Sequence, residues 1–252
     1  WVCKSNYYFY KSLQINVMKK YYFTITSLLV LVICLASCSK EENKTQNQVA
    51  ARPTLPIMDN EVQIGNQIWM TKNLNVSRYR NGDPIPQVTN PTQWANLTTG
   101  AWCYYNNDLA NGPIYGKLYN WYAVNDPRGL APVGWHIPTD AEWTALTTFL
   151  GFTDVAGGKM KATGTLESGT GLWKSPNASA TNSSGFSALP GGYIADNGSG
   201  FFLIVRYGYW WSTTEFGSLR AIARILNYTN GSITTLEFFK DNGFSVRCIK
   251  NQ

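Results

Sequence analysis

Histidine is almost missing from this sequence, since His136 is the only one among 252 residues. General acid–base catalysis uses histidine more often than any other side chain, and zinc sites are commonly built from histidines or closely spaced cysteines. The five cysteines include no Cys-x-x-Cys motif, and no motif places a serine or an aspartate beside His136. We therefore expect no catalytic residue, no metal ligand and no cofactor, and we interpret His136 as a hydrogen-bonded packing residue.

Charged residues are also few, at 14% of the chain, whereas hydrophobic residues reach 44% and aromatic residues 14%. This balance excludes an intrinsically disordered chain, because disorder requires low hydrophobicity and high net charge. The length allows one large domain or two small ones.

The N-terminal region has the plan of a secretory signal. Met18, the first methionine, precedes Lys19 and Lys20, an apolar stretch and small residues before Cys38. The apolar stretch is shorter than the roughly 20 residues that span a bilayer, so a transmembrane anchor is the less favoured alternative. Residues 35–38, Leu-Ala-Ser-Cys, resemble the lipobox of bacterial lipoproteins. The resemblance implies that residues 18–37 are a signal peptide and that Cys38 carries the acyl chains that anchor the mature protein.

Removing the leader changes the charge of the chain. Residues 1–37 hold four lysines and no acidic residue. Without them, 17 basic residues stand against 15 acidic ones, and the formal net charge falls from +6 to +2. No strong electrostatic signature for a nucleic-acid partner remains.

Two further segments lie outside the expected domain. Residues 1–17 precede Met18, and we expect them to be an over-extended reading frame. Residues 38–59 begin with a polar, charged run, which indicates a flexible tether. Within it, residues 40–42, Lys-Glu-Glu, resemble the short export signal of surface lipoproteins in Bacteroidetes, although an ordinary solvated linker fits equally well. The expected location is the outer membrane, lipid-anchored and facing the exterior.

One domain is expected over residues 60–252. Apolar residues alternate on either side of Gly65-Asn66, which predicts a β-hairpin over residues 62–70. Residues 116–124 carry apolar side chains at helical spacing and predict a short amphipathic helix. Thr139 and Glu142 form a capping-box pattern ahead of a helix that ends at Gly151.

The second half of the chain favours β-structure. Strand candidates cover residues 201–206, 209–213, 219–228, 233–239 and 244–249, with a hairpin turn at Asn230-Gly231. Early helices followed by a run of antiparallel strands predict an α+β domain.

Several sequence blocks together resemble the Fibrobacter succinogenes major paralogous domain. They are residues 62–70, 101–108, 115–121, 134–143, 184–193, 209–215 and 244–248. They occur in the family's order and cover nearly all of residues 60–250. The family is common in secreted and lipid-anchored proteins of Bacteroidetes and Fibrobacteres, and it has no established common activity.

Residues 137–143 and 246–248 also resemble parts of the formylglycine-generating-enzyme fold, a variant of the C-type lectin fold. This resemblance implies a twisted antiparallel sheet with two flanking helices and long loops. Those enzymes use a pair of reactive, copper-binding thiols, and no such pair is found here. The resemblance therefore does not carry their activity over to this chain.

Cys103 and Cys248 are the only thiols left once Cys38 and the leader are set aside. Export implies an oxidising compartment, so we expect them to form a disulfide. The alternative is two buried thiols that pack as small apolar groups.

Aromatic side chains give the best indication of binding. Tyr104, Tyr209, Trp210 and Trp211 are candidate ligand contacts, because flat rings with polar edges suit both sugar stacking and protein interfaces. The favoured interpretation is nevertheless that most of them build the core, because large aromatic side chains dominate core burial. Adjacent residues on a strand face opposite ways, so we expect one of Trp210 and Trp211 to be exposed. Oxygen-rich segments at residues 106–108 and 196–198 are interpreted as turns rather than as Ca²⁺ sites.

These observations favour a surface lipoprotein with a non-catalytic domain for binding or adhesion, whose partner is a glycan or a surface protein. A carbohydrate-binding accessory protein of a glycan-uptake system is the second hypothesis. An enzyme of the formylglycine-generating type or a glycan-active hydrolase is the third.

Overall fold

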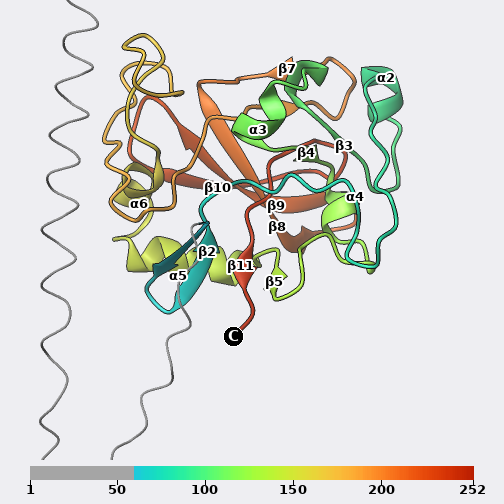
Figure 1. Cartoon of the computed structure of the whole chain (residues 1–252), viewed down its shortest axis with the longest axis horizontal. Coiled ribbons are helices and arrows are strands. Elements are labelled where there is room, and N and C mark those ends of the chain that lie inside the picture. Colours follow the sequence, from blue (N-terminus) through green and yellow to red (C-terminus); the bar gives the residue numbers. More distant parts are fainter. Residues whose placement is uncertain (1–59) are drawn as a thin grey trace, which may run out of the picture. The chain divides into compact units, whose positions relative to one another are not determined.

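The computed structural model describes residues 60–252 (Figure 1). The predictions for residues 1–17, 18–37 and 38–59, including lipidation at Cys38, lie outside this part of the chain. In the described part, no helix combines the length and the hydropathy needed to cross a membrane.

The domain is α+β, with more strands than helices and with antiparallel sheets. The helices are α2 (Pro91–Trp94), α3 (Asn111–Tyr115), α4 (Trp121–Val124), α5 (Asp140–Phe149) and α6 (Thr153–Met160), with a 3₁₀ turn at Tyr105–Asn107. The strands are β1 (Glu61–Ile64), β2 (Gln67–Met70), β3 (Trp102–Cys103), β4 (Leu118–Tyr119), β5 (Trp135–His136), β6 (Tyr193–Ile194), β7 (Phe201–Phe202), β8 (Tyr207–Phe216), β9 (Arg220–Asn227), β10 (Ile233–Phe239) and β11 (Ile249–Lys250).

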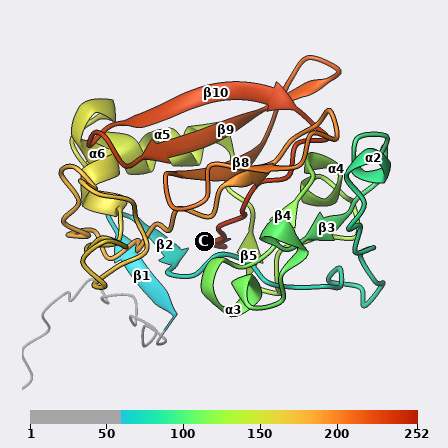
Figure 2. The ribbon, with the colours of Figure 1, turned by 90° about the horizontal axis from the view of Figure 1, so that it is seen from above.

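The longest strands form one antiparallel sheet in the order β10-β9-β8. The turn between β9 and β10 contains Asn230-Gly231, as predicted. Figure 2 shows these strands at the top of the domain, with α5 and α6 beside them and the shorter sheets on the far side of β8. A second sheet has the order β1-β2-β11-β5 and includes the predicted hairpin of β1 and β2.

Three of the predicted elements are shorter than expected. The helix predicted over residues 116–124 is divided: β4 comes first, and the Asn120 side chain then caps α4 by accepting from the Ala123 N–H. Of residues 201–206, only β7 is a strand, because Leu203 and Val205 adopt positive φ angles and turn the chain. Of residues 244–249, only Ile249 lies in a strand, whereas Phe244 and Ser245 make single bridges.

The capping box at the start of α5 is confirmed. Thr139 Oγ1 accepts from the Glu142 N–H at 3.2 Å, and Glu142 Oε2 accepts from the Thr139 N–H at 2.8 Å. Each side chain thus satisfies a backbone donor that the first helical turn leaves without a partner.

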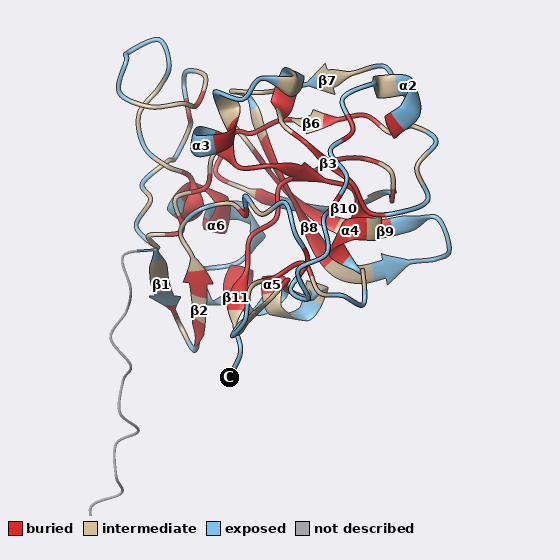
Figure 3. Cartoon of the chain, turned by 45° about the vertical axis from the view of Figure 1, so that its right-hand side comes forward, coloured by how far each residue is buried: buried red, intermediate tan, exposed pale blue. Residues whose placement is uncertain are grey.

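Both tryptophans of β8 are fully buried, so the expectation that one is exposed is wrong. Trp211 faces one hydrophobic cluster, where its ring centroid lies 4.3 Å from that of Phe244, and Trp210 faces a second cluster near Phe186. The alternation along the strand holds, but both faces of the sheet are covered. Figure 3 shows how burial concentrates in these central strands.

Candidate ligand-binding cleft

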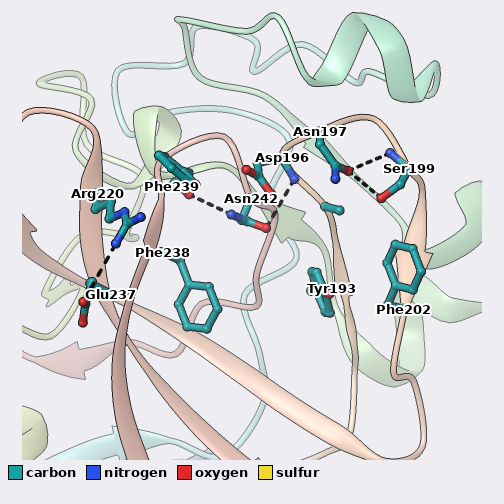
Figure 4. A pocket seen from close by; sticks show the side chains of 11 residues that line it. Tyr193, Asp196, Asn197, Ser199, Phe202, Arg220, Glu237, Phe238, Phe239 and Asn242 are labelled. Carbon is teal, nitrogen blue, oxygen red and sulfur yellow. Dashed lines mark hydrogen bonds and ion pairs between the residues drawn. The ribbon is translucent and has the colours of Figure 1, made fainter.

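An open cleft of about 390 Å³ lies between the β6–β7 hairpin and the adjoining ends of β9 and β10 (Figure 4). Aromatic rings and polar side chains line it in a mixed pattern. The lining residues are Tyr193, Ala195, Asp196, Asn197, Ser199, Phe202, Arg220, Glu237, Phe238, Phe239 and Asn242.

The β6–β7 hairpin forms one wall of the cleft. Tyr193 and Phe202 are cross-strand partners, so their rings lie on the same face with centroids 5.6 Å apart. The turn between the strands is closed by Asn197, whose Oδ1 accepts from the Ser199 N–H at 3.0 Å and from its hydroxyl. Phe202 is 38% exposed, so this wall offers an accessible ring.

The opposite wall comes from the end of β10 and the start of β9. Phe238 is anchored edge-on against Phe244, with ring centroids 4.9 Å apart. Phe239 is 40% exposed, and the Arg220 guanidinium lies over its ring at 4.6 Å. Arg220 also faces Glu237, with 3.9 Å between Nη1 and Oε1. This wall thus combines a second accessible ring with a charged pair.

Asn242 is buried and ties the two walls together. Its Oδ1 accepts from the Asp196 N–H at 3.3 Å, and its Nδ2 donates to the Phe239 carbonyl at 3.1 Å. A side chain held at both ends by backbone groups fixes the width of the cleft at this point.

The Asp196 side chain lines the cleft, and its carboxylate has no partner among the described residues. Within residues 60–252, no hydrogen bond or ion pair is made to its side chain. Burial, followed by the nearby Asp196 charge, raises the pKa of Tyr193 above its ordinary value. Tyr193 therefore keeps its phenolic proton and can donate a hydrogen bond, while Asp196 can accept from a ligand.

The candidate residues from the sequence lie around the cleft or far from it. Tyr209 is buried beneath the cleft, with its ring centroid 5.0 Å from that of Tyr193, so it supports the wall and makes no part of its surface. Tyr104 is half-buried elsewhere, beside Lys117 Nζ at 4.9 Å from its ring centroid. Trp210 and Trp211 belong to the core.

From the sequence, the accessible residues of the cleft are not identified as candidate ligand contacts. Only residues 196–198 are named among them, and these are interpreted as a turn. Phe238-Phe239 at a strand end carried the same signal of paired aromatics as Trp210-Trp211, and there one ring is in fact accessible. No cluster of three histidine, cysteine or acidic side chains suited to a metal ion occurs among residues 60–252.

The two cysteines do not form the expected disulfide. Cys103 and Cys248 are free thiols in the structure, and both are fully buried. Cys103 packs with Val88 and Trp94, whereas Cys248 belongs to the cluster around Trp211. Burial raises the pKa of Cys248 to about 12 and moves that of Cys103 in the same direction. The sulfurs therefore behave as small apolar groups, as in the alternative that the sequence left open.

His136 uses both ring nitrogens in local contacts. Nε2 lies 2.7 Å from Glu142 Oε1, and Nδ1 lies 2.8 Å from Asn251 Oδ1. The residue thus connects the cap of α5 to the C-terminal segment, and it does not line the cleft.

Comparison with known proteins agrees with the family resemblance. Residues 62–250 match the family model of the Fibrobacter succinogenes major domain. The searches of curated proteins and of solved structures gave no match. The match includes every strand and helix that lines the cleft and covers most of the chain. This chain therefore belongs to the Fibrobacter succinogenes major domain family.

Proposed function

We propose that this chain is a lipid-anchored surface protein whose domain binds a carbohydrate, without catalysis, in the cleft between the β6–β7 hairpin and β10. One observation carries the proposal: two accessible rings, Phe202 and Phe239, share an open cleft with the unpartnered carboxylate of Asp196. The N-terminal lipobox-like sequence supports the anchor, and the α+β domain with long loops is in keeping with a C-type-lectin-like fold.

The chemistry of the cleft suits a sugar. Sugar rings present apolar C–H faces and hydroxyl edges, so they need flat apolar surfaces beside hydrogen-bond acceptors and donors. Phe202 and Tyr193 supply the flat surface, Asp196 and Glu237 supply acceptors, and the amide nitrogen of Asn197 supplies a donor. The cleft is open, which suits a segment of a longer chain better than a fully enclosed small molecule.

Binding without catalysis is favoured by the composition of the cleft. His136, Cys103 and Cys248 all lie outside its lining. Of the two carboxylates in the lining, Glu237 already faces Arg220. A glycan-active hydrolase needs two carboxyl groups that act on the scissile bond from either side, whereas of these two only Asp196 is free of a partner.

A glycan array followed by affinity electrophoresis tests the ligand class. With the full-length chain, Phe202→Ala and Asp196→Asn should each weaken retention by about tenfold, equivalent to about 1.4 kcal/mol. Phe149→Ala is the matched control, because this ring is 63% exposed and lies outside the cleft. Failure to retain any glycan, or equal weakening by the control, would contradict the proposal.

The same samples test the rival readings. Recovery of the glycan with its chain length unchanged supports binding alone, whereas shortened products would favour a hydrolase. Cell fractionation tests the anchor separately: a Cys38→Ser chain should leave the membrane fraction. If it stays there, the anchor is not at Cys38.

A further inference from the structure

The outer edge of β10 is a long strand edge with no partner. β10 is the terminal strand of the sheet and pairs only with β9. Residues 234–237 are exposed on both faces of the strand. Native proteins usually protect such an edge with charged side chains, especially lysine, or with a proline, a bulge or a covering segment, and here Glu237 is the single charged residue of the strand. Between Ile233 and Phe239 there is no lysine or proline, and the pairing with β9 contains no register shift.

The hydrogen-bond pattern shows which backbone groups face outward. The Lys240 N–H donates to the Leu219 carbonyl, so Lys240 stands at an inward-bonding position of this antiparallel pair. Because bonding positions alternate in antiparallel pairs, Phe238, Leu236 and Thr234 also bond inward to β9. Glu237 and Thr235 therefore direct their N–H and C=O groups outward. Within residues 60–252, nothing bonds to these groups.

A second copy of the same strand can pair with this edge so that the outward groups of the two copies meet. We propose that two copies of the chain pair antiparallel along β10, with the twofold axis at Leu236. Each Thr235 would then exchange both outward hydrogen bonds with Glu237 of the second copy. Leu236 would face its own counterpart at a non-hydrogen-bonded position, where side chains approach most closely.

Charge and apolar contact together favour this register. An axis at Thr235 would bring no like charges together, but it would set Leu236 opposite Thr234 instead of opposite a second Leu236. A twofold axis at Glu237 would place two carboxylates directly opposite each other, which is destabilising. With the axis at Leu236, Glu237 faces Thr235, and no like charges meet between Ile233 and Phe239. The pairing would also cover Leu236, which is 46% exposed.

Pairing would join two three-stranded sheets into one sheet of six strands. The proposal does not depend on the nature of the ligand, because it rests on the outward backbone groups of Thr235 and Glu237, on the charge of Glu237 and on Leu236. It does place two clefts on one assembly, which would raise the avidity for a repeating partner.

Disulfide trapping in the full-length chain tests the register. Leu236→Cys should give a covalent dimer under mild oxidation, because paired Cα atoms at such a position lie about 4.5 Å apart, within disulfide range. Leu219→Cys is the matched control: it is 64% exposed and lies off the strand, so it should stay largely monomeric. Equal trapping of both variants, or of neither, would overturn the proposal.

Sedimentation of the detergent-solubilised full-length chain provides the second measurement. The parent protein should form dimers whose fraction rises with concentration, and Leu236→Lys should be monomeric, because it places two positive charges at the axis. Leu219→Lys should associate like the parent. A parent protein that stays monomeric, or that holds a different polypeptide along β10, would overturn self-pairing.

Discussion

The fully buried guanidinium of Arg247 is held by the half-buried side chain of Asn73: its Nη2 and Nε atoms donate to the amide oxygen of Asn73 at 2.9 and 3.2 Å. The same oxygen accepts from Trp210 Nε1 at 2.9 Å. The guanidinium also donates to the Met70 and Phe186 carbonyls, and no carboxylate faces it among residues 60–252. Burial lowers the pKa of Arg247 to about 9, so these neutral acceptors must hold a charge that has lost its water.

Replacing Asn73 with alanine should therefore destabilise the domain strongly. The change removes one acceptor from a buried charge and from a buried indole, so we expect a loss of about 3 kcal/mol in the free energy of unfolding. Asn96→Ala is the control, since Asn96 is exposed and binds only Thr92, and it should cost less than about 1 kcal/mol. Urea unfolding of both variants checks this, and similar losses would contradict it.

Lys161 predicts an unusual dependence of stability on pH. Its buried ammonium donates to the carbonyls of Ala178, Asn227 and Asn230, and burial lowers its pKa from 10.5 to about 8. Between these values the unfolded chain holds the proton and the folded chain releases it, so raising the pH favours folding. Relative to Lys161→Met, the parent protein should gain about 2 kcal/mol between pH 8 and pH 10.

The Lys161→Met chain is itself the control for this window, because its tyrosines respond to pH as those of the parent do. Unfolding measured at half-unit pH intervals gives the difference directly. If the free energy of unfolding of the parent, relative to that of Lys161→Met, falls as the pH rises, folding does not disfavour the ammonium.

The two buried cysteines should be inert until the chain unfolds. Their pKa values are raised because burial disfavours the thiolate, which is the reactive form. We expect iodoacetamide to leave Cys103 and Cys248 unmodified in native protein and to alkylate both in guanidinium without reductant. Peptide mapping by mass spectrometry reads both outcomes. A peptide pair that links Cys103 to Cys248 would instead establish the disulfide.

Glu142 should contribute to stability at neutral pH and lose this contribution in acid. Burial by itself raises the pKa of Glu142, but hydrogen bonds from the Thr139 N–H, His136 and the Thr139 hydroxyl outweigh it, and the net direction is downward. A carboxylate with a lowered pKa stabilises above the unfolded value, near 4.5, and this stabilisation disappears as the pH falls. Glu142→Gln should lower the free energy of unfolding by about 1 kcal/mol at pH 7 and by less near pH 3.

Glu237→Gln, at an exposed position on β10, is the comparison for this titration. It should change the free energy of unfolding by less than about 0.5 kcal/mol at either pH. If Glu142→Gln lowers the free energy of unfolding equally at pH 7 and pH 3, the effect comes from the shape of the side chain and not from its charge.

Local signals in the sequence were sufficient for the elements that depend on neighbouring residues. The capping box of Thr139 and Glu142 and the hairpin at Gly65-Asn66 are set within a few residues, and the structure contains both. The helix expected over residues 116–124 is shorter than predicted because this segment depends on contacts with distant residues. Apolar spacing alone could not reveal that Tyr119 would bond to Phe244, more than a hundred residues away.

The candidate site shows the same division. Alternation correctly placed Trp210 and Trp211 on opposite faces, but burial of both faces depends on which distant segments cover the sheet. The cleft brings Asp196 and Phe202 close to Arg220 and Phe239, and Asn242 contacts both sides. The spacing of these residues in the sequence does not predict that they lie together.

By itself, the sequence determined the family, the α+β class and the elements whose hydrogen bonds close within a few residues. The tertiary structure alone decided which aromatic rings reach solvent, that Cys103 and Cys248 lie free in separate clusters, and where the cleft opens. The physical reason is that turns and caps are local interactions. Exposure instead depends on which distant segments pack together, a result of the whole fold.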